Sequence, residues 1–249
     1  MKTAELLQWK EWNVMKILAI DTSAVCASVA VTENGKVLSE SSVNTGLTHS
    51  RTLLPMIDST LKNAEIELND IDFFACSVGP GSFTGVRIGV AAVKGLCDGL
   101  GKKAMPVSTL EALAYNLSDR DCIAVPVMDA RCQQVYCGIF LNEGGAVTRL
   151  MEDSALKIDD LGEILKEYEG EIIFVGDGAE ICHKALGYKK AGASSVYQKG
   201  SSVAFAAERN YSEDNLLSGA ELMPTYLRLP QAERELKAKS LKKGDLNNG

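Results

Sequence analysis

The chain has 249 residues, of which 46% are hydrophobic and 24% are charged, and its formal net charge is -7. This size and composition are typical of a globular protein with one large domain or two small ones, and they exclude a disordered or fibrous chain. The negative net charge excludes a general basic surface for nucleic acid, so any RNA contact requires a local patch or a basic partner.

Seven cysteines indicate a reducing compartment. Their number is odd, no Cys-x-x-Cys pair occurs, and most lie in apolar runs such as 73–78, which is typical of buried, reduced thiols. No run of about 18 apolar residues occurs, and residues 1–14 lack the apolar centre of a signal peptide. We therefore expect a cytoplasmic protein without membrane contact, in which residues 1–14 form an extension or tag-like segment.

The first half of the chain predicts the order β-β-β-α-β-α-β. Asn34-Gly35 is a strong two-residue hairpin signal between two runs of strand character. After Thr48, which has the character of an N-cap, apolar residues recur at helical spacing. The expected elements are strands at 15–21, 27–32 and 36–43, a helix over 48–63, a strand at 71–78, a helix over 85–100 and a strand at 103–107.

The second half of the chain repeats this order without residue-level periodicity. Its expected elements are strands at 122–128, 134–141 and 146–150, a helix over 161–168, a strand at 172–176, and helices over 179–186 and 202–209. We predict two α/β lobes with mixed sheets and flanking helices, at 15–115 and 116–229, followed by a charged tail at 230–249. A duplicated topology of this kind resembles the actin/Hsp70/sugar-kinase (ASKHA) superfamily, which does not by itself determine function.

Five motifs carry a closer resemblance, which covers about residues 15 to 229. They are KILAIDTS at 16–23, THSRTLLP at 48–55, GPGSFTGVRIG at 79–89, Asp129-Ala-Arg131 followed by Val135-Tyr136, and PTYLR at 224–228. Together they resemble the TsaB (YeaZ) family of bacterial tRNA threonylcarbamoyladenosine biosynthesis subunits. GPGSFTGVRIG is the most specific of them.

The resemblance implies a non-catalytic subunit that binds TsaD and acts with the ATPase TsaE. The complex transfers threonylcarbamoyl to the adenosine next to the anticodon of ANN-decoding tRNAs. TsaD holds the metal, and ATP and Mg²⁺ are used through TsaE and TsaD, so no tightly bound cofactor is expected in this chain. A homodimer is expected when the chain is alone, and tRNA contact is expected through the complex.

Two loops are candidates for a vestigial nucleotide site. In the ASKHA superfamily the loop between the first two strands faces the phosphates, but an Asp-Thr-Ser turn also satisfies its own backbone. The glycine turn before residue 85 could cradle an anion, although it matches neither the Walker motif nor GxGxxG and Pro80 removes one donor. We favour an architectural turn with Thr84 capping the helix. The candidate contacts are Asp21, Thr22, Ser23, Gly79, Gly81, Ser82 and Thr84.

Two helices are expected to form the partner interface. The only charges of the 86–100 segment, Arg87, Lys94 and Asp98, share one stripe and leave most of the circumference apolar. Paired with two helices of TsaD, this helix and the one over 48–63 would make a four-helix interface. Val90→Arg or Val93→Arg is expected to abolish pairing and leave the fold intact. The expected interface residues are His49, Leu53, Met56, Ile57, Leu61, Arg87, Val90, Val93, Lys94 and Cys97.

Catalytic and metal-binding residues are not expected. TsaD carries a His-x-x-x-His metal pair where this chain has the histidine-free segment 107–114, and His49 and His183 fall in different lobes. A small-molecule kinase that uses Asp21 and the glycine turn on ATP stays an alternative. The absence of metal ligands from the sequence disfavours a metallopeptidase.

Two further segments leave alternatives open. Asp129-Ala-Arg131 is either a strand-end contact, such as an internal ion pair, or a carboxylate that faces the other lobe or a nucleotide. Arg228 is expected to pair with a partner where the C-terminus returns to the body. The basic stretch from Arg228 to Lys243 is either solvated or contacts the tRNA backbone.

Overall fold

Two five-stranded sheets with the same strand order form the framework of the protein. The computed structural model describes residues 14–228, and the sheets run β3-β2-β1-β4-β5 and β8-β7-β6-β9-β10. In each sheet the first three strands in chain order pair antiparallel, and the remaining two continue it in parallel. The identical order confirms the predicted duplicated ASKHA-like fold, with two mixed sheets and flanking helices.

The first lobe follows the predicted element order closely. The Asn34-Gly35 turn joins β2 to β3, and β1 and β4 are almost completely buried. Its elements are β1 (Lys16–Asp21), β2 (Ala27–Glu33), β3 (Lys36–Val43), α2 (His49–Ala64), the 3₁₀ turn Leu68–Asp70, β4 (Phe73–Gly79), α3 (Phe83–Leu100), β5 (Ala104–Ser108) and α4 (Thr109–Tyr115).

The second lobe departs from the prediction at its edges. Strand β8 is longer than expected, the helix after it begins and ends earlier, and a two-residue strand β10 completes the sheet. The elements are β6 (Cys122–Asp129), β7 (Gln134–Glu143), β8 (Ala146–Lys157), α5 (Ile158–Leu165), β9 (Ile172–Val175), α6 (Ala179–Leu186), β10 (Lys189–Lys190), α7 (Gly200–Arg209) and the 3₁₀ turn Glu213–Asn215.

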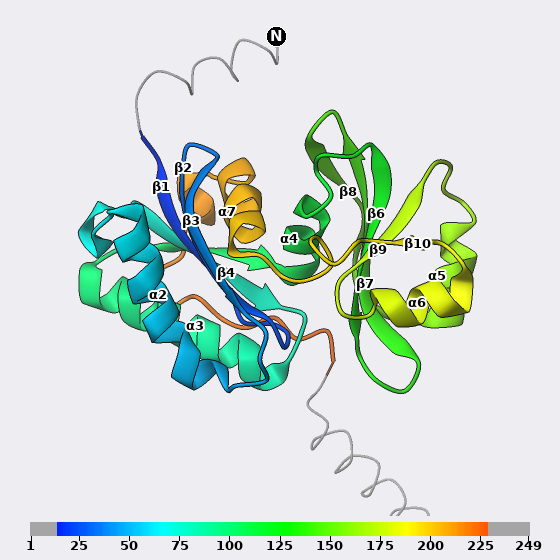
Figure 1. Ribbon diagram of the computed structural model, residues 1–249, viewed down its shortest axis with the longest axis horizontal. Coiled ribbons are helices and arrows are strands. Elements are labelled where there is room, and N and C mark those ends of the chain that lie inside the picture. Colours follow the sequence, from blue (N-terminus) through cyan, green and yellow to red (C-terminus); the bar gives the residue numbers. More distant parts are fainter. Residues whose placement is uncertain (1–13, 229–249) are drawn as a thin grey trace, which may run out of the picture.

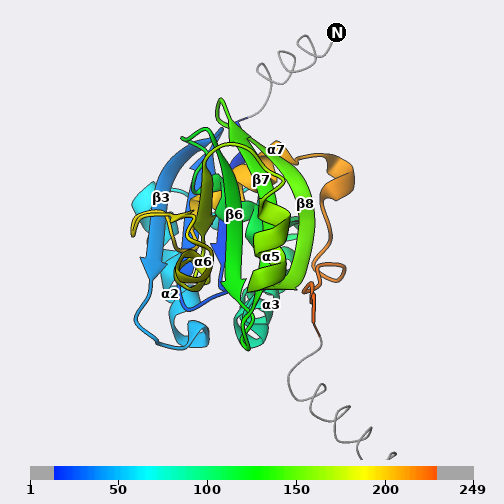
Figure 2. The same ribbon diagram turned by 90° about the vertical axis from the view of Figure 1, so that its right-hand side faces the viewer.

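The helices form three layers around the two sheets. α2 and α3 cover the outer face of the first sheet, and α4 and α7 lie between the sheets (Figure 1). α5 and α6 cover the outer face of the second sheet, as Figure 2 shows from that side. Four clusters of buried apolar side chains fill the spaces between these layers.

The two helices between the sheets, α4 and α7, each contact the sheet of the other half of the chain. α7 comes from the second half of the sequence but packs against β1 and β2 of the first sheet, while α4 contacts β6 and β7 of the second. The amide of Gly200 donates to Ser28 Oγ at 2.9 Å, and Ser201 N and Oγ each donate to a Glu40 carboxylate oxygen at 2.9 Å. A division at residue 116 therefore does not describe how these two helices pack.

Within residues 14–228, none of the helices combines the length and the apolar character needed to span a bilayer. The predicted segment 1–14 lies outside the described residues except for Val14, and the tail 230–249 lies outside them entirely.

Candidate functional site

A cleft of about 660 Å³ is lined by loops of both lobes that contain the sequence motifs. The β1–β2 loop, the turn before α3 and the start of α2 form one wall, and the β6–β7 loop with Asp177 forms the other. Of the seven predicted nucleotide contacts, four line the cleft, namely Ser23, Gly81, Ser82 and Thr84. Asp21, Thr22 and Gly79 are buried behind it.

Asp21 is a buried structural carboxyl. Its Oδ1 accepts hydrogen bonds from Ser23 N at 2.8 Å and Ser23 Oγ at 2.6 Å, and its Oδ2 accepts from Ser77 Oγ at 2.6 Å. Burial raises the pKa of Asp21, although the bonds from Ser23 and Ser77 act in the opposite direction. Both oxygens are engaged inside the first lobe, so this carboxyl does not project toward a ligand in the cleft.

Two amides of the glycine turn also donate within the protein. Ser82 N donates to the Ser23 carbonyl at 2.6 Å, and Gly85 N donates to Ser82 Oγ at 3.2 Å. Ser82 is therefore the N-cap of α3, and the prediction that Thr84 caps the helix is wrong. The Thr22 hydroxyl donates to the Gly85 carbonyl at 2.7 Å, which ties the β1–β2 loop to the first turn of the helix.

The glycines of this turn permit close approach of other backbone segments. A Cβ at Gly81 would lie 2.4 Å from the Ser23 carbonyl oxygen, and one at Gly85 would lie 2.1 Å from the Thr22 carbonyl oxygen. At Gly79, φ is +119° and a Cβ would lie 2.4 Å from the Thr225 carbonyl oxygen. The turn thus joins the β1–β2 loop, α3 and the C-terminal segment, as an architectural turn would.

A phosphate and its Mg²⁺ fit this first-lobe wall poorly. The acidic side chain that would approach the metal is buried and bonded to two serines. The amides of Ser82 and Gly85, which would contribute to an anion cradle, already donate within the protein. We derive no nucleotide chemistry from this wall, and the kinase alternative loses the support of Asp21, whose two oxygens accept hydrogen bonds within the lobe.

Two carboxylates, those of Asp129 and Asp177, line the second-lobe wall of the cleft. The amide of Asp129 donates to Asp177 Oδ1 at 3.2 Å, and the amide of Arg131 donates to Asp129 Oδ1 at 2.7 Å. Burial raises the pKa of Asp177, and the neighbouring Asp129 carboxylate raises it further. The contact between Asp129 and Arg131 is a strand-end hydrogen bond to the backbone and not an ion pair. Asp129 nevertheless faces the cleft between the lobes.

Sequence reasoning missed Asp177. Its signal was the Gly-Asp-Gly triplet at 176–178, directly after the parallel strand β9, because ligand clefts form at the carboxyl ends of parallel strands. Arg228 also lines the cleft. It donates to the Ala130 carbonyl at 3.3 Å and to the Gln134 side-chain oxygen, so its partners are neutral.

Seven of the ten predicted interface residues are core residues of the first lobe. Their side chains point toward the sheet, and each is at most 7% exposed. A partner cannot contact them without unfolding the lobe, because helical spacing placed the apolar stripe correctly but the stripe faces the chain's own sheet. These residues are Leu53, Met56, Ile57, Leu61, Val90, Val93 and Cys97.

The other three predicted interface residues make contacts within the chain. His49 Nε2 lies 2.7 Å from the Ala24 carbonyl oxygen. Arg87 Nε donates to the Tyr226 hydroxyl at 2.8 Å, and the guanidinium lies 4.1 Å from the centre of the Phe83 ring. Lys94 Nζ donates to the Ala220 carbonyl at 3.4 Å. Arg87 and Lys94 thus hold the C-terminal segment against α3.

Comparison with known proteins identifies the family. The family model for TsaD, tRNA N6-adenosine threonylcarbamoyltransferase, matches residues 43–233. The tRNA threonylcarbamoyladenosine biosynthesis protein TsaB of Bacillus subtilis (strain 168) is 33% identical over 226 residues, which cover 88% of this chain and 96% of that protein. The chain belongs to the TsaB family.

Two further comparisons show how much of each relative the similarity covers. YeaZ from Pseudomonas aeruginosa has a TM-score of 0.75 and 25% sequence identity, and the match covers 86% of this chain and 100% of that one. A tRNA N6-adenosine threonylcarbamoyltransferase of Prosthecochloris aestuarii (strain DSM 271 / SK 413) is 30% identical over 122 residues, only 35% of its length. Similarity to TsaB and YeaZ therefore spans most of the chain, whereas this similarity to the transferase is partial.

For this member of the TsaB family, both imidazoles already have backbone neighbours. His49 contacts Ala24 as described, and His183 Nδ1 lies 2.7 Å from the Tyr188 carbonyl oxygen. Residues 14–228 contain no cluster of three or more His, Cys, Asp or Glu side chains that could hold a metal ion. The geometry therefore offers no metal centre in this part of the chain.

Proposed function

We propose that this chain is a non-catalytic subunit in the formation of tRNA threonylcarbamoyladenosine, the modification named in its TsaB relatives. In this proposal it binds TsaD, which transfers threonylcarbamoyl to the adenosine next to the anticodon of ANN-decoding tRNAs. TsaE is the third component, and ATP and Mg²⁺ act through TsaE and TsaD. The engaged state of Asp21 and of the glycine turn supports a binding role over catalysis by this chain.

The observation that carries the proposal is the solvent-facing side of α2 and α3, here called the outer helical face. Leu54 is 62% exposed in the middle of α2. On α3, Ala91 and Gly95 are exposed, and Ile88 and Ala92 are partly buried. A Cβ at Gly95 would meet nothing within 4 Å.

Small and apolar side chains let a second pair of helices approach closely. The two helices lie side by side as the outermost layer of the first lobe (Figure 1). We therefore propose that TsaD contacts the outer helical face. This is the side of α2 and α3 that faces away from the sheet, opposite the seven core residues. The same face would form a homodimer when TsaD is absent, because a self-complementary apolar surface can pair with its own copy.

Light scattering tests this proposal directly. Three proteins are compared: the wild-type chain, Leu54→Arg and Gly95→Arg. Each is measured alone and then mixed with TsaD from the same organism. We expect the wild type to convert from a homodimer to a one-to-one heterodimer, and both variants to remain monomeric in both samples. Each variant should keep the wild-type circular dichroism spectrum, because the new side chain enters solvent.

Gly192→Arg is the matched control. Gly192 is exposed in the second lobe, and a Cβ there also meets nothing within 4 Å. This variant adds the same charge and should pair like the wild type. If Leu54→Arg and Gly95→Arg pair with TsaD at wild-type affinity, the outer helical face is not the interface. If the wild-type chain does not bind TsaD at all, the scaffold role itself fails.

A further inference from the structure

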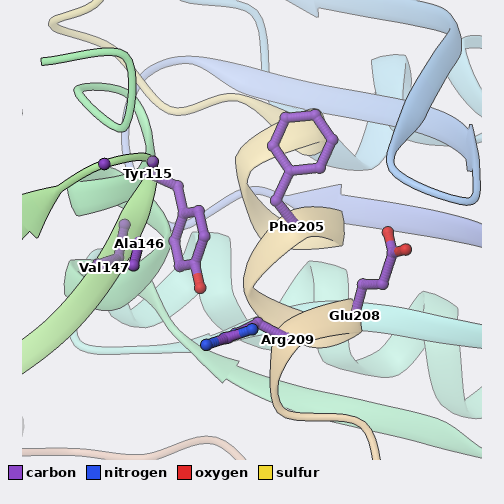
Figure 3. A pocket seen from close by; sticks show the side chains of 8 residues that line it. Tyr115, Ala146, Val147, Phe205, Glu208 and Arg209 are labelled. Carbon is purple, nitrogen blue, oxygen red and sulfur yellow. The ribbon is translucent and has the colours of Figure 1, made fainter. Parts of the chain in front are cut away.

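A second groove lies between the middle helices and the β7–β8 hairpin. Its volume is about 480 Å³, within the range of small-molecule sites. Tyr115 at the end of α4, the hairpin residues 144–147, and Phe205, Glu208 and Arg209 on α7 line it (Figure 3). It shares no lining residue with the cleft described above, so it is a separate feature of the molecule.

Two hydrogen-bond donors in this groove make no hydrogen bond or ion pair with the described residues. Arg209 is exposed in the last turn of α7 and takes part in none of the ion pairs of residues 14–228. The Tyr115 hydroxyl points toward Arg209 in Figure 3 and makes no hydrogen bond within the same range. Burial and the nearby Glu111 carboxylate raise the pKa of Tyr115 to about 12, although the Arg209 charge acts in the opposite direction, so its hydroxyl remains a donor at neutral pH.

The carboxylates near Arg209 are engaged elsewhere. Glu208 lies beside the backbone of Gly35, and Figure 3 shows its carboxylate pointing away from Arg209. Glu111 accepts from Asn210 Nδ2 at 2.7 Å and pairs with Arg149 at 3.4 Å. The positive charge of Arg209 is therefore available to a ligand that approaches from the groove.

Apolar surfaces complete the site. The Tyr115 and Phe205 rings stand on opposite sides of the groove, with Ala146 and Val147 beside Tyr115 (Figure 3). The hairpin that carries these two residues is held at its tip, because Gly144 N donates to Asp121 Oδ1 at 2.9 Å. Ring surfaces favour a flat, apolar body, and a guanidinium with a phenol favours a carboxylate or phosphate group.

We propose that this groove binds a small anion with a flat, largely apolar body, whose carboxylate or phosphate accepts hydrogen bonds from Arg209 and the Tyr115 hydroxyl while its ring lies between Tyr115 and Phe205. Aromatic carboxylates meet this description fully, and nucleoside monophosphates share its flat ring and its anionic group. Because α7 packs on the first sheet and the hairpin belongs to the second, the bound anion bridges the two lobes.

The test is a calorimetric titration of the full chain with two probes, adenosine 5′-monophosphate and benzoate. We expect saturable one-to-one binding of at least one probe with a Kd of about 1 mM or tighter. Saturation by the nucleotide alone assigns a nucleotide site, saturation by benzoate alone assigns a carboxylate site, and saturation by both supports the shared chemistry. Absence of saturable binding for both probes overturns the proposal.

Variants locate the bound probe. Arg209→Ala should weaken binding about tenfold or more, because it removes the charge that pairs with the anion. Tyr115→Phe keeps the ring, removes only the hydroxyl, and should weaken binding several-fold. Arg51→Ala is the control, since it removes an exposed arginine from α2 and should bind like the wild type. Equal affinities for Arg209→Ala and Arg51→Ala would show that the probe binds elsewhere.

Discussion

The hydroxyl of Thr22 donates to the carbonyl of Gly85 at 2.7 Å, and a Cβ at Gly85 would lie 2.1 Å from the Thr22 carbonyl oxygen. The β1–β2 loop and the first turn of α3 therefore touch backbone to backbone. This contact assigns Gly85 of the GPGSFTG run to packing within the first lobe, where both Thr22 and Gly85 are buried.

Gly85→Ala should destabilise the protein by about 1–3 kcal/mol, because the added methyl group overpacks a backbone contact. Gly95→Ala, in the same helix, should stabilise it by about 0.5–1 kcal/mol, because that site is open and alanine favours helix. Urea unfolding of both variants measures the difference. Equal unfolding free energies for the two would contradict the close approach at Gly85.

Val90→Arg should unfold the first lobe and not merely prevent pairing. Val90 is 3% exposed in the core beneath α3, and a buried, unpaired charge costs about 3 kcal/mol or more. Circular dichroism and solubility of the isolated chain check this, with Leu54→Arg as the surface counterpart. A folded and soluble Val90→Arg protein would restore the interface originally predicted for this side of the helix.

The pKa of Asp21 is raised by burial, which determines how stability depends on pH. The folded state holds the proton to higher pH than the unfolded state, so the wild type loses stability as pH rises from the ordinary carboxyl pKa of 3.8 toward the raised folded value. Asp21→Asn removes this contribution and keeps hydrogen-bonding groups near Ser23 and Ser77.

Urea unfolding at several pH values between 4 and 7 measures the contribution of Asp21 to the unfolding free energy. The unfolding free energy of the wild type minus that of Asp21→Asn should fall as pH rises. Asp58→Asn, which removes an exposed carboxylate from α2, serves as the control for net charge. A difference that instead increases with pH would mean that the folded protein stabilises the Asp21 anion.

Cys132 should react with thiol reagents faster than the other six cysteines. Cys132 is exposed in the β6–β7 loop, whereas the others are buried. Burial raises the pKa of Cys26 to about 11 and that of Cys137 to about 12, so at neutral pH both stay protonated and react slowly. Ellman's reagent should therefore titrate one thiol in the native protein and all seven in guanidinium.

Cys132→Ser should eliminate the fast native reaction and leave six thiols in guanidinium. Two or more fast native thiols in the wild type would show that a region described as buried opens readily. A control at low denaturant, below the unfolding transition, tests whether any additional reactivity comes from partial unfolding.

Hydrophobic periodicity and turn signals determined most of the fold. The Asn34-Gly35 hairpin, the buried strands and the repeated element order predicted both lobes and both mixed sheets, because strand alternation and turn chemistry act between neighbouring residues. α4 and the two-residue strand β10 were absent from the expected element order, since short elements carry little pattern of their own. The five motifs quoted above likewise indicate the TsaB family from the sequence alone.

Only the tertiary structure decided which way the helices face and which groups meet. α3 is apolar around most of its circumference, so periodicity could not tell the sheet-facing side, with Val90 and Val93, from the outer helical face. Asp21 meets Ser77 across 56 positions of sequence, and Asp177 reaches Asp129 across 48. Such contacts depend on how sheets and loops pack in space, and that information is spread over the whole chain and is not contained in any local pattern.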